Sequence, residues 1–334
     1  MRKFVSAAVV FASLVFASSA FAGEPAWRFR PGQTFTYECS TEFHYVQFTR
    51  TVAGQGLTTG ETTTTTEDPQ WENVTFKVTV LNVGDDGAAR MEFIVESVHI
   101  ETRFDSSGDH ADWDSKKSRE TDIIGYKQYQ AILGHKFEAV IAADGAIREL
   151  KNAAWPVLDV SGMKETKKNE RAERAAKATH PPTPISAWLN LVFSSAPEAG
   201  GAWKRTLSIP QEEQLDARAD GTETIGKYPC AKSKLKSAEK ERGLKPGDVK
   251  APANADVAKV AEAMIQAVQK KGDVWFSRQH GCLVKMELEA AAEQSGAGRS
   301  TTHATMKWGV ELKSRGFTEL TPGGTGEPAP VETK

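Results

Sequence analysis

One acidic segment near the middle of the N-terminal half holds residue types that bind cations. Within ten residues it gathers four carboxylates and one imidazole: Asp105, Asp109, His110, Asp112 and Asp114. Ca²⁺ prefers several oxygen ligands at close range, which a flexible acidic loop can supply. The spacing differs from that of helix–loop–helix calcium sites, and no bidentate Glu follows at the required interval. We therefore expect a solvated loop over 105–114 that leads into an edge strand, and we assign no metal-binding residues. The sequence alone does not decide whether this loop binds a cation.

The three cysteines are a second candidate for chemistry. In an oxidising compartment two of them are expected to pair. We predict a disulfide between Cys230 and Cys282, because both lie on strand-like segments of the C-terminal half, and this leaves Cys39 as a buried free thiol. The alternative is that all three are small core residues. No histidine is placed to activate a thiol.

Other signs of catalysis are missing from the sequence. The seven histidines show no zinc-binding spacing, and there is no nucleophile elbow, phosphate-binding glycine loop or dinucleotide fingerprint. We accordingly predict no catalytic, metal or cofactor-binding residues, and no enzyme activity. Among the tryptophans, Trp188, Trp203, Trp275 and Trp308 lie in apolar-patterned segments and are expected in the core, whereas Trp113, between two aspartates, is expected to be exposed.

The first 22 residues have the layout of a secretory signal peptide. Two basic residues, Arg2 and Lys3, precede an apolar run that is too short to span a bilayer, and a small-x-small site ends at Ala22. Cleavage between Ala22 and Gly23 predicts a periplasmic or secreted protein. Because Gly23 is not a cysteine, no lipid anchor is expected.

The composition of the chain excludes some classes of binding partner. Removal of the leader leaves 312 of the 334 residues and moves the net charge from −2 to −4. A mildly acidic chain lacks the basic face that nucleic acid requires. The mean hydropathy is −0.45, and no second apolar stretch is long enough to cross a membrane. We thus expect a chain that does not span the membrane and does not bind nucleic acid; its partner and its oligomeric state remain unknown.

Residue periodicity predicts mainly antiparallel β structure. Apolar and polar residues alternate from Phe35 to Tyr45, and Asp86-Gly87 and Asp144-Gly145 mark hairpin turns between further alternating runs. Trp203 and Trp275 begin similar strand patterns in the C-terminal half. We expect a β-rich α+β fold with a few packed helices and two related lobes, either a β-sandwich or curved half-barrel sheets. The alternative is one long sheet with similar hairpins.

These patterns divide the chain into five parts. A signal peptide over 1–22 precedes an N-terminal β lobe over 23–160. A charged helix and a proline-rich linker occupy 161–187. The C-terminal β lobe over 188–318 carries a helical insertion at 254–271, and a disordered tail occupies 319–334.

The order of several short motifs resembles a family of uncharacterised secreted or lipid-anchored bacterial envelope proteins, catalogued as a domain of unknown function. These motifs are turn glycines, hairpins and aromatic strand starts: Pro31-Gly32, Phe35, Tyr37, Asp86-Gly87, Asp114-Ser115, Leu133-Gly134, Phe137, Ile141, Asp144-Gly145, Ile147, Gly200-Gly201, Trp203, Tyr228 and Cys230-Ala231. The likeness spans most of residues 27–315, but the family pattern has Gly-Asp where this chain has Gly200-Gly201. The resemblance implies a β-rich protein of the cell envelope, and it implies no catalytic residues.

Three hypotheses for function follow. The first is a noncatalytic cell-envelope protein whose curved sheet binds an apolar or lipid-like ligand. The second is a protein-interaction or structural module of the envelope that pairs exposed β edges, such as residues 58–66, with a partner chain. The third is an enzyme with dispersed site residues.

Overall fold

The computed structural model describes most of the two predicted β regions. The described residues are 27–53, 60–67, 69–104, 109–159, 183–193, 202–208, 212–237, 270–295 and 300–318. The predicted leader with its cleavage site at Ala22 and Gly23, the charged helix of the linker and the C-terminal tail lie outside them. Of the predicted insertion over 254–271, only Lys270 and Lys271 are described, and they begin a strand.

Strands dominate the described residues, which contain short helices in three places. The strands are β1 (Gln33–Ala53), β2 (Gly60–Glu67), β3 (Gln70–Val83), β4 (Ala89–Phe104), β5 (Asp109–Asp114), β6 (Lys136–Ile141), β7 (Ile147–Lys151), β8 (Ala202–Ser208), β9 (Glu212–Ile225), β10 (Tyr228–Ser237), β11 (Lys270–Ser277), β12 (Cys282–Ser295) and β13 (Ser300–Phe317). The helices are η1 (Ile124–Tyr126), α1 (Lys127–Ala131) and α3 (Ile185–Val192). No helix of the described chain has the length and apolarity needed to cross a bilayer.

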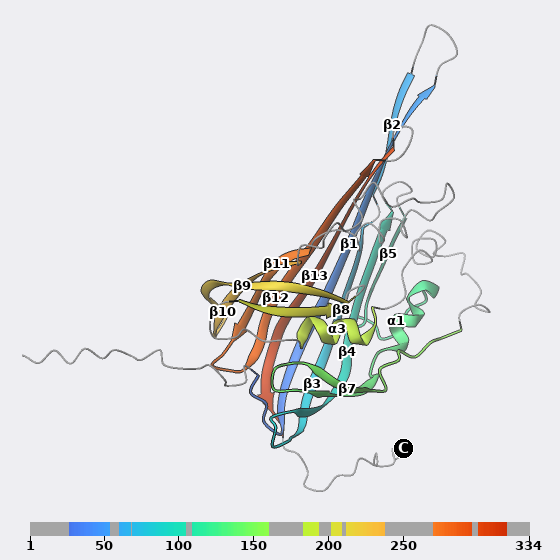
Figure 1. Cartoon of the computed structure of the whole chain (residues 1–334). Helices are drawn as coiled ribbons and strands as arrows, with labels where there is room; N and C mark the ends of the chain where they lie inside the picture. The colour runs from blue at the N-terminus through green and yellow to red at the C-terminus, as the bar shows by residue number, and fades with distance from the viewer. Residues whose placement is uncertain are drawn as a thin grey trace, which may run out of the picture.

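All strands join one open antiparallel sheet, which curves strongly (Figure 1). The strand order is β7-β6-β4-β3-β1-β13-β12-β11-β10-β9-β8, with β2 paired to β1 and β5 paired to β4. The predicted mainly antiparallel fold with few helices is confirmed. The N-terminal and C-terminal halves are not separate sheets, because β1 pairs with β13 along seventeen residue pairs from Gln33↔Phe317 to Thr49↔Ser300.

The core lies on one face of this sheet. On β1 the predicted alternation holds, with Phe35, Tyr37, Cys39 and Phe43 buried. Helix α3 packs against β8, β1 and β13 on the same face, and Trp188, Trp203 and Trp308 are buried there as predicted. Trp275 is also buried, but on the opposite face, with the Lys232 and Lys285 ammonium groups over its ring. Aromatic rings fill the space beneath α3: Phe193 lies 5.0 Å from Trp27 and 5.8 Å from Phe93 between ring centroids. This packing leaves the opposite face of the sheet, here called the outer face, to polar residues.

Turn glycines fix the hairpins that the sequence predicts. Gly87 closes the β3–β4 turn at φ +75°, and Gly145 closes the β6–β7 turn at φ +94°. Residues with a Cβ rarely adopt this left-handed conformation, so glycine is favoured at both positions.

The predicted loop over 105–114 is wrong for its second half. Residues 109–114 form β5, which pairs antiparallel with β4 from His99↔Asp114 to Phe104↔Asp109. Alternation along β5 places Ala111 and Trp113 on the core face, so Trp113 is buried rather than exposed. Its indole nitrogen donates to the carbonyls of Ser118 (3.0 Å) and Glu120 (3.2 Å). The polar partners of the indole explain why a tryptophan flanked by aspartates can still be buried.

The predicted disulfide is not formed in this structure. Cys39, Cys230 and Cys282 are all free and buried. Cys282 pairs with Ser277 of β11, and β11 separates Cys282 on β12 from Cys230 on β10. Strands two positions apart lie about 9–10 Å from each other, beyond the roughly 7 Å over which two Cα atoms can be bridged. Burial raises the pKa of Cys230 to about 11 and that of Cys282 to about 12.

Thiol titration tests this arrangement. We expect the native mature protein to react negligibly with Ellman's reagent, because all three thiols are buried and protonated at neutral pH. Unfolding in guanidinium without reductant should then release three reactive thiols per chain. A single reactive thiol after unfolding would instead indicate a bridge, and non-reducing peptide mapping would identify its partners.

Candidate functional site

A groove crosses the outer face of the sheet at right angles to its strands. It has a volume of about 1390 Å³ and is lined by residues of seven consecutive strands in the sheet order, from β3 to β9. Its floor is the backbone of one row of paired residues, Thr41↔Trp308, Trp308↔Leu288, Leu288↔Gly272 and Gly272↔Leu235. The side chains of this row are buried and point to the core face. Glu72 and Ala217 continue this row at its two ends and also point into the core, while their strand neighbours on the outer face line the groove.

The walls of the groove are the two rows that flank the floor. One wall is formed by Asn73, Ser40, Gly309, Glu287, Asp273, Lys234 and Arg218, each paired with the next across the sheet. The other wall is formed in the same order by Trp71, Glu42, Lys307, Glu289, Lys271, Lys236 and Asp216. The small residues Ser40 and Gly309 keep the first wall low at its centre. The groove therefore exists only because seven strands share one register.

Charges along the groove are distributed unevenly. Near its middle, Glu42 pairs with Lys307 (3.1 Å) and Glu289 with Lys271 (3.0 Å). The end at β9 to β11 is richer in cations. There Lys234 pairs with Asp220 (3.3 Å), but Arg218 and Lys236 form no ion pair with any described residue. We call these four cations (Arg218, Lys234, Lys236 and Lys271) the basic end of the groove.

Trp71 marks the opposite end. Its indole ring is half-buried, with the His44 ring 6.1 Å away between centroids and the Arg103 guanidinium 5.3 Å above it. Trp71 pairs with Glu101 of β4, and Asn73 pairs with His99. Both walls thus continue beyond the groove onto β4 and β5.

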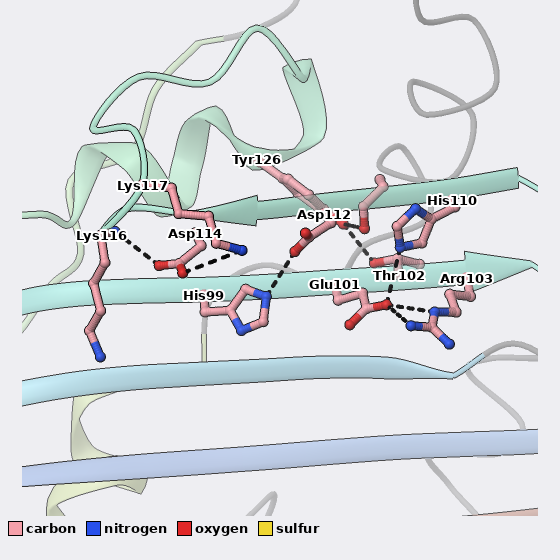
Figure 2. Close-up of polar contacts among 11 residues, drawn as sticks. His99, Glu101, Thr102, Arg103, His110, Asp112, Asp114, Lys116, Lys117 and Tyr126 are labelled. Carbon is pink, nitrogen blue, oxygen red and sulfur yellow. Dashed lines mark hydrogen bonds and ion pairs between the residues drawn. The ribbon is translucent and has the colours of Figure 1, made fainter.

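On β4 and β5 the walls become a cluster of imidazoles and carboxylates, here called the His99 cluster (Figure 2). The His99 Nε2 atom lies 2.8 Å from Asp112 Oδ1, and the His110 Nε2 atom lies 3.1 Å from Glu101 Oε1. Arg103 donates to the same Glu101 oxygen. One ligand atom each of His99, Glu101 and Asp112 lies within 4.8 Å of the others, which is close enough for a shared cation.

Buried hydrogen bonds beneath the cluster hold β5 against β4. The Tyr126 hydroxyl donates to the Ala111 carbonyl (2.9 Å) and lies 3.1 Å from the Thr102 hydroxyl. Since Ala111 and Thr102 alternate with His110, Asp112 and Glu101, these contacts fix the positions from which the cluster projects.

The structure brings together only part of the acidic segment singled out from the sequence. His110 and Asp112 belong to the cluster. Asp114 instead accepts from the Lys116 backbone N–H (2.9 Å) and lies 3.8 Å from Lys117 Nζ. Asp105 and the side chain of Asp109 lie outside the described residues. His99 and Glu101 were not predicted as site residues from the sequence, although alternation along residues 97–103 places both on one face of a strand.

A serine–histidine pair occurs elsewhere in the fold but lacks an accessible nucleophile. The Ser277 hydroxyl lies 2.9 Å from His280 Nδ1, at the β11–β12 turn. Ser277 is fully buried, so no substrate can reach its oxygen. The pKa of His280 is lowered by partial burial and by the nearby Arg315 and Lys227. We interpret this pair as a turn contact.

Comparison with known proteins gives weak likenesses in fold. No family model matches the chain, and no curated protein matches its sequence. A solved structure on lipid–protein interactions in lipovitellin is similar with a TM-score of 0.46 and 9% identity; it covers 91% of this chain, which spans only 27% of the lipovitellin chain. A DUF1329 family protein from Desulfovibrio piger is similar with a TM-score of 0.12 and 5% identity, over 82% of this chain and 85% of that one. Neither likeness is close enough to assign a family or a function.

Proposed function

We propose that this chain is a noncatalytic binding protein of the bacterial cell envelope, secreted or periplasmic, and that the groove is its binding surface. The observation that carries the proposal is a groove of about 1390 Å³ across seven strands, with the cations Arg218 and Lys236 unpaired among the described residues at one end. The signal-peptide layout of residues 1–22 supports the envelope location.

The charges of the groove select a lipid-like ligand with an anionic headgroup. A phosphate or carboxylate at the basic end meets Arg218 and Lys236, which gain charge-assisted hydrogen bonds there. Lysine side chains also present apolar stems, and Trp71 adds an aromatic face, so the remainder of an amphiphile finds apolar contact along the walls. The core face, by contrast, is filled by aromatic residues and α3.

Charge reversal at the basic end tests this proposal. We expect Arg218→Glu with Lys236→Glu to weaken binding to phosphatidylglycerol vesicles at least tenfold, about 1.4 kcal/mol, because two attractive contacts become repulsive. Lys77→Glu is a matched control, since Lys77 is an exposed strand lysine outside the groove. Vesicle co-sedimentation at several salt concentrations measures the effect.

Native mass spectrometry with organic extraction, on protein exported and purified from its host envelope, identifies the ligand directly. A discrete anionic lipid that is lost from the charge-reversed variant would support the proposal. Equal binding of phosphatidylglycerol and phosphatidylcholine vesicles, or equal binding by the variant and the Lys77→Glu control, would contradict it.

A second candidate function follows from the β1–β2 ribbon, which projects beyond the rest of the sheet (Figure 1). Among the described strands β2 pairs with β1 alone, from Val46↔Glu67 to Ala53↔Gly60. A strand with one unpaired backbone edge can add a strand from a partner chain. Crosslinking in the envelope tests this function: Thr64→Pro removes one backbone donor of β2 and should abolish capture of a partner that pairs with this edge.

A further inference from the structure

The geometry of the His99 cluster points to a binding site for a divalent transition-metal ion of the Zn²⁺ class, held by His99, Glu101 and Asp112. The three side chains project from neighbouring strands on the outer face, and their ligand atoms lie within 4.8 Å of one another. Ligand atoms around four-coordinate Zn²⁺ are about 3.3 Å apart, given bonds of about 2.0–2.1 Å. Small rotations of these partly exposed side chains close that difference.

The donor set favours Zn²⁺ over the Ca²⁺ considered for residues 105–114. Imidazole nitrogen combined with carboxylate oxygen suits Zn²⁺ and its neighbours, whereas Ca²⁺ takes six to eight oxygen ligands. The cluster offers two carboxylates on strands, too few and too widely fixed for a calcium loop. His110 stands 3.1 Å from Glu101 Oε1 and provides a further imidazole beside the ion.

Arg103 decides how tightly the ion binds. In the structure its guanidinium contacts Glu101 and lies over the Trp71 ring, so it neutralises one of the carboxylates that a metal ion needs. Metal and guanidinium compete for Glu101. This competition gives the site a signature that a purely structural ion-pair network lacks: removal of Arg103 strengthens metal binding.

The site lies where the groove walls reach β4, because Glu101 pairs with Trp71 and His99 with Asn73. A bound ion would place positive charge at the end of the groove opposite the basic end. Metal binding itself needs no ligand in the groove, so this inference stands or falls separately from the proposed function.

Calorimetric titration of ZnCl₂ into the EDTA-treated mature protein tests the site. We expect one Zn²⁺ per chain, with Kd raised at least tenfold by His99→Gln and by Asp112→Asn. His135→Gln is the matched control and should leave Kd unchanged, because His135 is a half-buried histidine just before β6 that is not part of the His99 cluster. Arg103→Gln should lower Kd several-fold. Circular dichroism of each variant verifies folding, and Co²⁺ absorption reports whether the ion has nitrogen and oxygen ligands in four-coordinate geometry.

Three results would overturn the inference. They are the absence of Zn²⁺ binding by the wild-type chain, tighter binding of Ca²⁺ than of Zn²⁺, and equal Kd values for His99→Gln and His135→Gln. If Arg103→Gln weakens binding instead of strengthening it, Arg103 does not compete with the ion and the assignment of Glu101 as a ligand is wrong.

Discussion

Replacing Lys270 with methionine is expected to lower the free energy of unfolding by about 3–5 kcal/mol. Lys270 and Glu213 form an ion pair on the core face, with side chains only 2% and 6% exposed. Methionine keeps the volume but leaves the Glu213 carboxylate buried without a counter-charge, and its Oε1 atom already lacks a hydrogen-bond partner. Guanidinium-induced unfolding of the mature protein measures the change.

Lys271 is the matched control, because it is the next residue on β11 and its ion pair with Glu289 is exposed to solvent. Lys271→Met should change the free energy of unfolding by about 1 kcal/mol or less. The double variant Lys270→Met with Glu213→Leu should recover most of the loss, since apolar pairs often replace buried ion pairs without cost. Equal losses for Lys270→Met and Lys271→Met would contradict the assigned role of the buried pair.

The ion pair between Lys270 and Glu213 also supports the strands that form the basic end of the groove. Glu213 lies on β9 and Lys270 on β11, with β10 between them, and Ser237 of β10 accepts a hydrogen bond from the Lys270 backbone N–H (2.7 Å). These are the three strands that present the basic end on the opposite face. We therefore expect Lys270→Met to weaken ligand binding together with stability, whereas the Arg218 and Lys236 variants should weaken binding alone.

Local features of the fold could be predicted from the sequence. The alternation in β1, the hairpins at Gly87 and Gly145 and the burial of Trp188 and Trp308 all depend on residues close together in the chain. Side-chain periodicity and turn chemistry act over a few residues, so they are visible in one sequence. The fold class followed from them.

Long-range register could not be predicted in the same way. The groove floor depends on Thr41 pairing with Trp308, more than 260 residues later, and on three further strands adopting matching registers. Lys270 shows the same limit. The helical spacing of apolar residues before it predicts a helix over 254–271, whereas Lys270 begins β11, and its burial depends on an ion pair with Glu213 on β9 that the sequence does not show. The His99 cluster likewise depends on the pairing of β4 with β5, and the sequence pattern predicts a loop where β5 lies.

Glu72 shows how a polar residue in a strand can join distant segments. It lies on the core face of β3 and accepts hydrogen bonds from Thr183, through the backbone N–H (3.2 Å) and the hydroxyl (2.7 Å). The Thr183 carbonyl in turn accepts from the Trp155 indole (2.7 Å). Thr183 lies one residue before Pro184, the N-cap of α3, so these contacts anchor the beginning of the helix to the sheet. Burial raises the pKa of Glu72 to about 7, against the lowering effect of the Thr183 hydrogen bonds.

Replacing Glu72 with glutamine is expected to make the chain more stable than wild type by about 3 kcal/mol at pH 8 and by about 1 kcal/mol or less near pH 5. The folded chain holds the Glu72 proton more tightly than the unfolded chain, in which the pKa of this carboxyl is near 4.5. The stabilisation of the wild-type fold by protonated Glu72 is therefore complete below pH 4.5 and is lost as the pH rises through about 7. Glutamine resembles the protonated acid, keeps an acceptor for the Thr183 N–H and cannot ionise. Urea unfolding between pH 5 and pH 8 measures the difference, with the exposed Glu96→Gln on β4 as control. The other titrating groups contribute equally to variant and wild type, so they cancel in this comparison. A stability difference that does not change with pH would contradict the prediction. It would show that Glu72 ionises normally and that its contact with Thr183 does not depend on a proton.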